Sequence, residues 1–267
     1  MKTPVIPTPV DGLCWLTGAS SGIGEALLAD LVKEGWRVAI SARSKDKLDA
    51  LARRHPGKVF AYPVDISDDR AVATTVAQIE SDHGPIVRAI LNAGVYISIE
   101  AEHPRFEDYA KTFDVNLKGA AACVCALTPR FCERGKGQLV IVSSATAFGG
   151  MPTATAYGAT KAGLLNMAEG LAIELYRYGV KVQCVTPGFV DTPAQDDNAF
   201  PKPFMVSAET AAKRICKGMN RTGFEITFPK RFTWILKLIY ALPRDWHIAL
   251  VRKQTGWDKP PEEKKPA

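Results

Sequence analysis

Short apolar runs alternate along most of the chain with longer segments in which apolar residues recur at helical spacing. The apolar runs are continuous, as is typical of parallel strands that are buried on both faces. The predicted strands are Leu13–Thr17, Arg37–Ser41, Val59–Val64, Ile86–Asn92, Gln138–Val142 and Lys181–Thr186, with Phe224–Phe228 as a last one.

Helical periodicity occupies the segments between these strands. The predicted helices are Ile23–Glu34, Lys45–Arg54, Asp69–His83, Phe106–Arg134 and Ala154–Tyr178. The fourth is long, and we expect it to break near Asn116. Strand–helix alternation with right-handed crossovers favours a doubly wound sheet. We therefore predict an α/β fold, a single Rossmann-type domain whose mostly parallel seven-stranded sheet carries helices on both faces.

The C-terminal end differs from the rest in charge. Nine basic and four acidic residues follow position 228, which accounts for +5 of the net charge of +6. We expect the catalytic domain to span residues 1–228. Residues 229–257 are predicted to form a basic amphipathic extension, and residues 258–267, rich in Pro, Lys and Glu, a disordered tail.

Composition favours a soluble, cytoplasmic protein. The first residues lack the apolar stretch of a secretory signal, and no apolar run reaches the roughly 20 residues of a membrane span. The six cysteines form no C-x-x-C pair and no cluster with histidine, so we predict free thiols and no metal site.

A glycine-rich turn follows the first strand and opens the first long helix. Gly18, Gly22 and Gly24 allow positive φ and a close approach of backbone amides to a pyrophosphate, and the helix N-terminus favours negative charge. A tight strand–helix junction of any kind can use such glycines. Their place after the first strand favours a dinucleotide site.

The end of the second strand predicts which dinucleotide binds. A carboxylate there would hold the ribose 2′-hydroxyl of NAD, but the sequence has no acid before Asp46. Arg43 can instead pair with a 2′-phosphate, and Ser44 can add a hydrogen bond. The alternative is a solvated surface arginine. We predict that NADP(H) is preferred over NAD(H).

Tyr157 and Lys161 are four residues apart and therefore share one helix face. A free tyrosine has a pKa near ~10, and a nearby ammonium lowers the pKa of a phenol. Ser144 lies thirteen residues before the tyrosine. The pattern predicts a proton donor with a lowered pKa beside the dinucleotide site.

Together these motifs resemble the short-chain dehydrogenase/reductase family, in its single-domain branch, over residues 10 to 228. They occur in the family's order: Thr17–Gly24, Asp65, Asn92 to Gly94, Asn116, Ser144, Tyr157 with Lys161, and Pro187-Gly188 with Thr192. The resemblance implies an NAD(P)-dependent oxidoreductase that transfers hydride between a nicotinamide and a carbonyl or alcohol.

The resemblance also implies the catalytic roles. Tyr157 is the general acid or base, and Ser144 donates a hydrogen bond to the substrate oxygen. Lys161 holds the nicotinamide ribose, and Asn116 holds a water joined to Lys161. Ser143 is expected to point to the other face of its strand.

For the cofactor, the resemblance places Asp65 at the adenine with Ile66 beside it, Asn92 near the adenine ribose, or in a purely structural turn, and Thr192 at the carboxamide. The full set expected to bind the cofactor is Gly18, Ser20, Ser21, Gly22, Ile23, Gly24, Arg43, Ser44, Asp65, Ile66, Asn92, Ala93, Gly94, Tyr157, Lys161, Pro187, Gly188, Val190 and Thr192.

The substrate is expected to be a small hydrophobic ketone, aldehyde or alcohol. Family comparison places a lid between Pro193 and Ser207, which holds Asp196, Asp197, Phe200, Pro201, Pro203, Phe204 and Met205. Phe148 and Met151 are candidates to line the pocket. The alternative is that these apolar groups only pack the lid.

The extension carries a wide apolar surface that includes Phe232, Trp234, Leu236 and Leu238, and basic residues accompany it. Three interpretations stay open: a helix lying in a membrane interface, a helix packed over its own pocket, or a contact within a homo-oligomer. Nucleic acid is not an expected partner, because the body of the chain is close to neutral.

Two other functions compete with a carbonyl reductase. A catalytically silent nucleotide-binding regulatory or scaffold protein at a membrane surface needs no phenol, so the set of Asn116, Ser144, Tyr157 and Lys161 argues against it. An enzyme acting on nucleotide sugars usually carries an extra substrate domain, for which the extension is too short.

Overall fold

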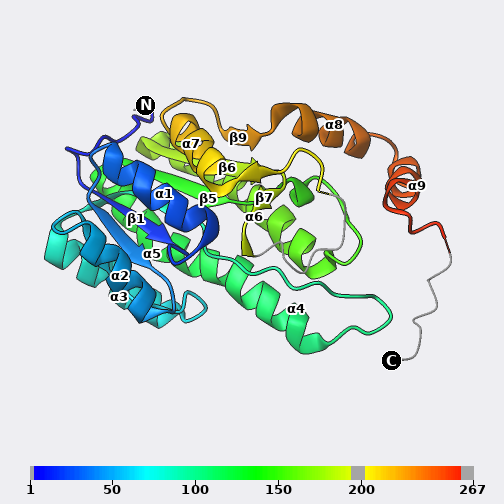
Figure 1. The fold of residues 1–267 in the computed structure, drawn as a ribbon. Coiled ribbons are helices and arrows are strands. Elements are labelled where there is room, and N and C mark those ends of the chain that lie inside the picture. The colour runs from blue at the N-terminus through cyan, green and yellow to red at the C-terminus, as the bar shows by residue number, and fades with distance from the viewer. Residues whose placement is uncertain (1–2, 194–201, 260–267) are drawn as a thin grey trace.

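A parallel sheet of seven strands runs through the computed structural model, which describes residues 3–193 and 202–259 (Figure 1). The strand order is β3-β2-β1-β4-β5-β6-β9, and every pairing is parallel, which confirms the predicted fold. The strands are β1 (Leu13–Thr17), β2 (Val38–Ser41), β3 (Val59–Ala61), β4 (Ile86–Leu91), β5 (Gly137–Val142), β6 (Val180–Pro187) and β9 (Glu225–Phe228).

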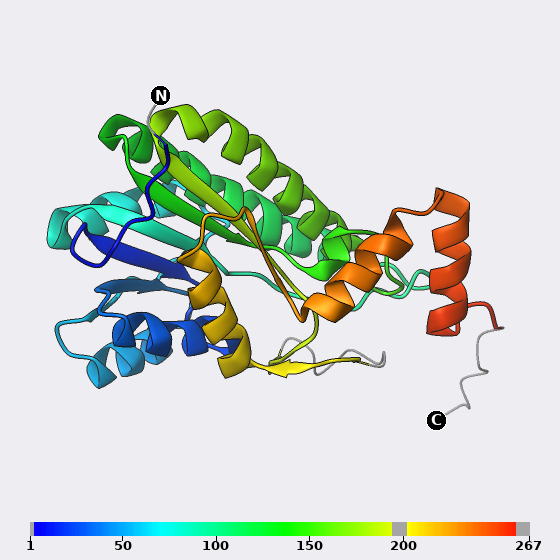
Figure 2. The same ribbon diagram turned by 90° about the horizontal axis from the view of Figure 1, so that it is seen from above.

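Helices cover both faces of the sheet, as Figure 2 shows. One apolar core lies between the sheet and α3 (Asp69–His83), α5 (Gly119–Arg134) and α6 (Thr155–Leu175). A second lies on the other face, under α1 (Gly22–Lys33), α2 (Lys45–Arg54) and α7 (Ala208–Met219). Burial on both sides explains why the strands are continuous apolar runs.

The expected break near Asn116 is confirmed. Helix α4 (Phe106–Phe113) passes into a π-helical turn, η1 (Asp114–Lys118), before α5 begins. A π-turn inserts an extra residue into the helical ladder and rotates the side chains that follow it. Here the turn carries Asn116, which is fully buried.

The sequence analysis predicted no helix over the residues of α7. Its signals are the Ser207 hydroxyl, which accepts a hydrogen bond from Thr210 N at 3.2 Å as an N-cap, and the helical spacing of small apolar residues. It also missed a short parallel pair, β7 (Val190–Asp191) and β8 (Val206–Ser207). Two-residue strands leave no periodicity to detect.

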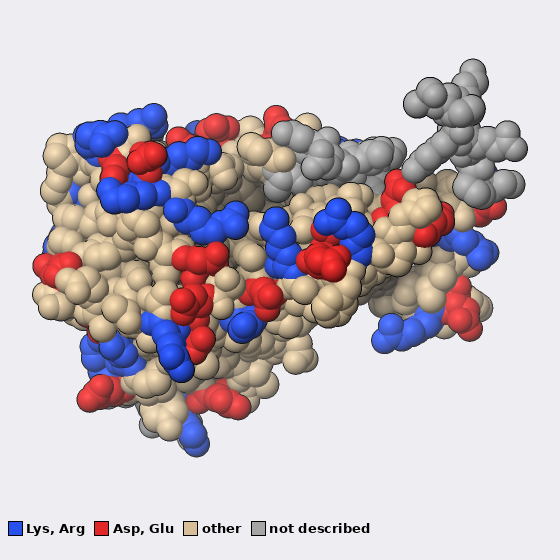
Figure 3. All heavy atoms as spheres, turned by 90° about the horizontal axis from the view of Figure 1, so that it is seen from below, with Lys and Arg blue, Asp and Glu red and all other residues tan. Residues whose placement is uncertain are grey.

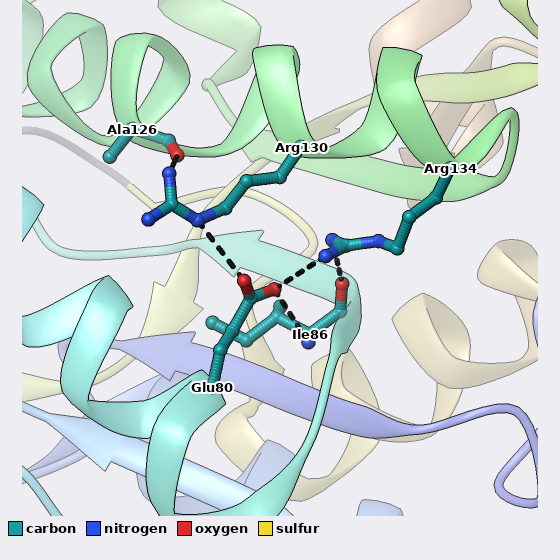
Figure 4. A network of polar contacts seen from close by, with 5 residues as sticks. All are labelled: Glu80, Ile86, Ala126, Arg130 and Arg134. Atoms are coloured by element: carbon teal, nitrogen blue, oxygen red, sulfur yellow. Dashed lines mark hydrogen bonds and ion pairs between the residues drawn. The ribbon is translucent and has the colours of Figure 1, made fainter.

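A carboxylate at the amino end of β4 connects two helices on one face (Figure 4). Glu80 of α3 accepts hydrogen bonds from Ile86 N at 3.0 Å, from Arg130 Nε at 3.1 Å and from Arg134 Nη1 at 2.9 Å. Arg134 also donates to Ile86 O at 2.9 Å. The network fixes α3 and α5 at the end of the sheet opposite to the candidate site.

The extension after β9 forms two helices, α8 (Lys230–Tyr240) and α9 (Arg244–Thr255). Because β9 ends at Phe228, α8 starts at the carboxyl edge of the sheet. Figures 1 and 2 show both helices projecting from that end of the molecule. Within residues 3–193 and 202–259, no helix has the length and apolarity that a bilayer crossing requires.

Candidate active site

A cavity of about 380 Å³ lies at the carboxyl ends of the central strands. Ligand sites in open parallel sheets form at this edge. Every residue predicted to bind the cofactor lines the cavity, with the exception of Gly24. Of the predicted catalytic residues, Ser144, Tyr157 and Lys161 line it, and Asn116 lies behind it.

The glycine-rich turn has the conformation that the sequence predicts. Gly18 and Gly22 adopt φ of +68° and +55°, a region that side chains other than glycine rarely occupy. A Cβ on Gly24 would stand 2.1 Å from Gly18 O, so this glycine permits the close contact of turn and helix. The turn therefore leaves the start of α1 open to the cavity.

Asn92 supports that turn. Its Nδ2 donates to Thr17 O at 3.2 Å and to Gly18 O at 3.1 Å. The Thr17 hydroxyl in turn accepts from Asn92 N at 3.1 Å and from Ala93 N at 3.2 Å. Of the two interpretations of Asn92, the structural turn is present, although the residue also lines the cavity.

The loops after β2 and β3 form one end of the cavity. Arg43 and Ser44 are exposed at its margin. Hydrogen bonds from Ser67 hold the pKa of Asp65 below its ordinary value, and the charge of Arg43 adds to this effect. Ile66 is buried against Gly119, where an added Cβ would stand 2.7 Å from Ile66 Cγ1.

Ser144 and Tyr157 meet at the other end of the cavity. Ser144 caps the short 3-10 helix η2 (Ala145–Ala147), with its Oγ accepting from Thr146 N at 3.2 Å. Tyr157 lies in the first turn of α6, and its ring packs edge-on against Tyr96 at 5.2 Å between centroids. Tyr96, which lines the cavity, was missed by sequence analysis although it lies just beyond the Asn92 to Gly94 turn.

The prediction that Lys161 lowers the pKa of Tyr157 is wrong for this structure. Burial raises the pKa of Tyr157 to about 12, and a hydrogen bond with Ser144 opposes the rise only in part. The Lys161 ammonium donates to Val142 O at 2.9 Å and lies 5.4 Å from the centre of the phenol ring. Burial also lowers the pKa of Lys161 to about 8, which weakens the charge available to act on Tyr157.

The hydroxyl of Ser143 forms a hydrogen bond with the backbone of helix α6. Its Oγ donates to Lys161 O at 2.7 Å, whereas the neighbouring Ser144 faces Tyr157. This agrees with the expected alternation along the strand.

Asn116 holds the chain beside the site. Its Oδ1 accepts from Val95 N at 2.7 Å, and its Nδ2 donates to Val95 O at 2.9 Å and to Thr160 Oγ1 at 3.2 Å. A Cβ on Gly94 would stand 3.2 Å from Asn116 Oδ1 and 3.6 Å from Lys161 Nζ, so both groups border this glycine. The water that the sequence analysis places beside Asn116 stays a prediction.

The loop after β6 closes the cavity. Pro187 ends the strand, and Gly188 N donates to Phe228 O at 2.8 Å. A Cβ on Gly22 would stand 3.1 Å from Thr192 Cγ2, so the loop crosses directly over the glycine-rich turn. Val190 is buried beneath it.

Helix α8 forms a wall of the cavity through Phe232, Leu236 and Tyr240, which are spaced one turn apart. The Tyr240 hydroxyl donates to Gly150 O at 3.0 Å. Packing of the extension over its own pocket, one of the three interpretations, is therefore present. The opposite face of α8 is exposed.

Part of the predicted lid lies outside the described residues, namely Asp196, Asp197, Phe200 and Pro201. Phe204 is described and lies 6.1 Å from Phe232 between ring centroids. Among the pocket candidates, Met151 lines the cavity. Phe148 instead packs beneath the Lys237 ammonium, at 5.0 Å from its ring centre.

Comparisons with known proteins agree with this geometry. A family model described as short chain dehydrogenase matches residues 13–201. An uncharacterized oxidoreductase of Myxococcus xanthus is 33% identical over 89% of this chain and 95% of its own. The 3-oxoacyl-acyl-carrier-protein reductase of Thermotoga maritima is 32% identical over 77% of this chain and 83% of its own.

Among solved structures, a short chain dehydrogenase from Burkholderia cenocepacia in complex with NADP superposes with a TM-score of 0.79. It covers 94% of this chain and 99% of its own at 24% sequence identity. At that identity the likeness concerns the fold alone.

Proposed function

The chain belongs to the short-chain dehydrogenase family of NAD(P)-dependent oxidoreductases, and from that premise we propose that it is an NADP(H)-dependent carbonyl reductase or alcohol dehydrogenase acting on a hydrophobic ketone, aldehyde or alcohol. The observation that carries the proposal is the convergence of Ser144, Tyr157 and Lys161 in one cavity with the glycine-rich turn.

The residues present fit a dinucleotide. The left-handed glycines and the start of α1, whose N-cap Ser21 makes no side-chain capping bond, would form a cradle for the pyrophosphate, since a helix N-terminus offers backbone amides to an anion. In the proposed complex Asp65 and Ile66 border the adenine, Lys161 holds the nicotinamide ribose, and Thr192 bonds the carboxamide. The nicotinamide supplies or accepts the hydride.

The preference for NADP(H) is supported by the loop after β2. Arg43 and Ser44 lie at the margin of the cavity, where a ribose 2′-phosphate would sit. The fold itself accommodates this cofactor, since the short chain dehydrogenase from Burkholderia cenocepacia was solved in complex with NADP.

Tyr157 is the proposed proton donor for carbonyl reduction. With a pKa raised to about 12, its phenol keeps its proton at neutral pH and can give it to the oxygen on which charge develops. The Ser144 hydroxyl, which lies beside Tyr157, would donate to that same oxygen. Alcohol oxidation needs the phenolate and is therefore expected to speed up as the pH rises.

The cavity walls favour an apolar substrate. Met151, Phe189, Phe232, Leu236 and Tyr240 line the side near Tyr157. Within the part of the chain that the structure describes, the charged residues that line the cavity are Arg43, Asp65 and Lys161. All three are assigned to binding the proposed cofactor. A phosphorylated or sugar substrate would need basic groups, and the described lining of this side contains none beyond those assigned to the cofactor.

The test is Tyr157→Phe, which removes one oxygen from the site. We expect turnover of carbonyl compounds with NADPH to fall by about 10²-fold or more, with NADPH affinity nearly unchanged. A panel of ketones and aldehydes screened for NADPH consumption supplies the substrate. Substantial activity in the variant refutes the role of Tyr157. NADPH binding with no turnover of any carbonyl or alcohol favours the silent scaffold instead.

A further inference from the structure

Helix α8 has two faces with opposite surroundings. Phe232, Leu236 and Tyr240 line the cavity on the inner face. The outer face presents Trp234, Ile235 and Leu238, with Leu242 exposed just after the helix, and Trp234 and Leu238 are 59% and 69% exposed. One helix therefore separates the candidate active site from an apolar outer surface.

The helix is fixed in this orientation. Lys237 forms an ion pair with Glu225 of β9, and Tyr240 bonds to Gly150. The imidazole of His247, on α9, packs edge-on against the Tyr240 ring at 5.3 Å between centroids. These contacts hold both helices in place, and the apolar side chains of the outer face are exposed among the described residues.

Helix α9 continues the apolar surface. Trp246 and Ile248 are exposed there, Trp246 by 67%, and Trp257 follows the helix. With Trp234 of α8, three of the five tryptophans of the chain are thus exposed within residues 229–257. Tryptophan with leucine on a projecting helix is typical of proteins that lie in the membrane interface.

Charge favours an anionic partner. Residues 229–259 contain seven basic side chains against two acidic ones, Asp245 and Asp258. Figure 3 shows Lys and Arg side chains on the projecting part of the molecule, with Asp and Glu side chains among them and uncharged surface between. A two-fold contact between copies of the chain would bring two segments of net positive charge together, which repels. Anionic lipid headgroups complement this charge.

We infer that the outer face of α8 and α9 docks on an anionic lipid bilayer, and that the substrate enters the cavity from that bilayer past α8. The docking stands on the exposed residues and their charge. The route of the substrate rests also on the proposed function.

Vesicle flotation of the full chain tests the docking. We expect the protein to float with vesicles of phosphatidylcholine and phosphatidylglycerol, less at high salt, and weakly with phosphatidylcholine alone. The double variant Trp234→Glu, Leu238→Glu should lose at least about 10-fold in partitioning. Val10→Glu, at an apolar side chain 94% exposed before β1, is the matched control and should float like the wild type.

Three outcomes overturn the docking. The wild-type protein stays at the bottom of the gradient, or the double variant floats as well as the wild type. The third is a wild-type dimer in size-exclusion chromatography that the double substitution dissociates, which assigns the face to a second copy.

A comparison of substrates tests the route. The double variant should keep the kcat/KM for a short water-soluble ketone and lose about 10-fold or more with a long-chain ketone embedded in the anionic vesicles. An equal loss on both refutes the route. If the wild type reduces neither ketone, the proposed function fails, and flotation still decides the docking.

Discussion

The ring of Tyr240 lies directly on Gly149: a Cβ added to this glycine would stand 2.0 Å from Tyr240 Cε1. Real Cβ atoms do not approach a ring so closely, so the contact exists only because position 149 is glycine. It joins the C-terminal helix α8 to the loop between Ser144 and Tyr157. The shape of the cavity thus depends on a residue that touches neither cofactor nor catalytic groups.

Gly149→Ala is expected to push Tyr240 out of the cavity wall. The KM for a hydrophobic carbonyl should rise about 10-fold, corresponding to ~1.4 kcal/mol, whereas NADPH affinity should stay the same. Steady-state kinetics and a fluorescence titration with NADPH measure both. Gly150→Ala is the matched control, because a Cβ there meets nothing within 4 Å. Equal kinetics in the two variants would contradict the prediction.

Arg43→Asp should invert the choice of cofactor. The new carboxylate repels a 2′-phosphate and can accept hydrogen bonds from the ribose hydroxyl of NADH. We expect the ratio of NADPH to NADH affinity to fall at least about 100-fold. Arg53→Asp, on the exposed side of α2, makes the same charge change away from the cavity and should leave the ratio unchanged. Unaltered NADPH affinity in the Arg43 variant would show that Arg43 is a surface arginine.

Glu80→Gln is expected to destabilise the fold without affecting NADPH binding. The substitution removes the charge that pairs with Arg130 and Arg134, both of which are only partly exposed. A loss of about 1–2 kcal/mol in the free energy of unfolding follows from weakened charge-assisted hydrogen bonds. Denaturant titration measures it. Glu133→Gln, an exposed acid on α5, should change stability by less than about 0.5 kcal/mol.

The fold and the cofactor side of the cavity were predictable because their signals are local. Continuous apolar runs identify buried strands, and motifs such as Gly18 to Gly24 follow those strands directly. The strand order then brings their carboxyl ends together. Nothing local in the sequence says that Phe232 contacts Gly188, where an added Cβ would stand 2.9 Å from the ring. Such contacts depend on how the whole chain closes.

The electrostatics of the site were also hidden from the sequence. The spacing of Tyr157 and Lys161 predicts proximity but not burial, and burial decides both pKa values. The direction of the ammonium, toward Val142 O, is set by the end of β5. A motif therefore predicts which groups lie in the site, whereas their protonation states depend on burial and on the neighbouring groups.

Lys161→Met should stabilise the protein near neutral pH. Burial lowers the pKa of Lys161 from 10.5 to about 8 in the folded state. Between these values the unfolded chain binds a proton that the folded chain does not, so the contribution of Lys161 to stability is present above pH 10.5 and is lost as the pH falls to 8. The total loss is about 3 kcal/mol.

The difference in unfolding free energy between Lys161→Met and the wild type should therefore grow as the pH falls from 10.5 to 8 and then level off. Urea titrations across this range measure it, and subtraction cancels the other groups that titrate there. In Lys45→Met the lysine removed is exposed, and its pKa is raised by Asp49, so its difference should not grow in the same direction. A pH-independent difference for Lys161→Met would mean that Lys161 has the same pKa in the folded and the unfolded chain. If the trend appears together with loss of turnover, the site keeps Lys161 for activity at a cost in stability.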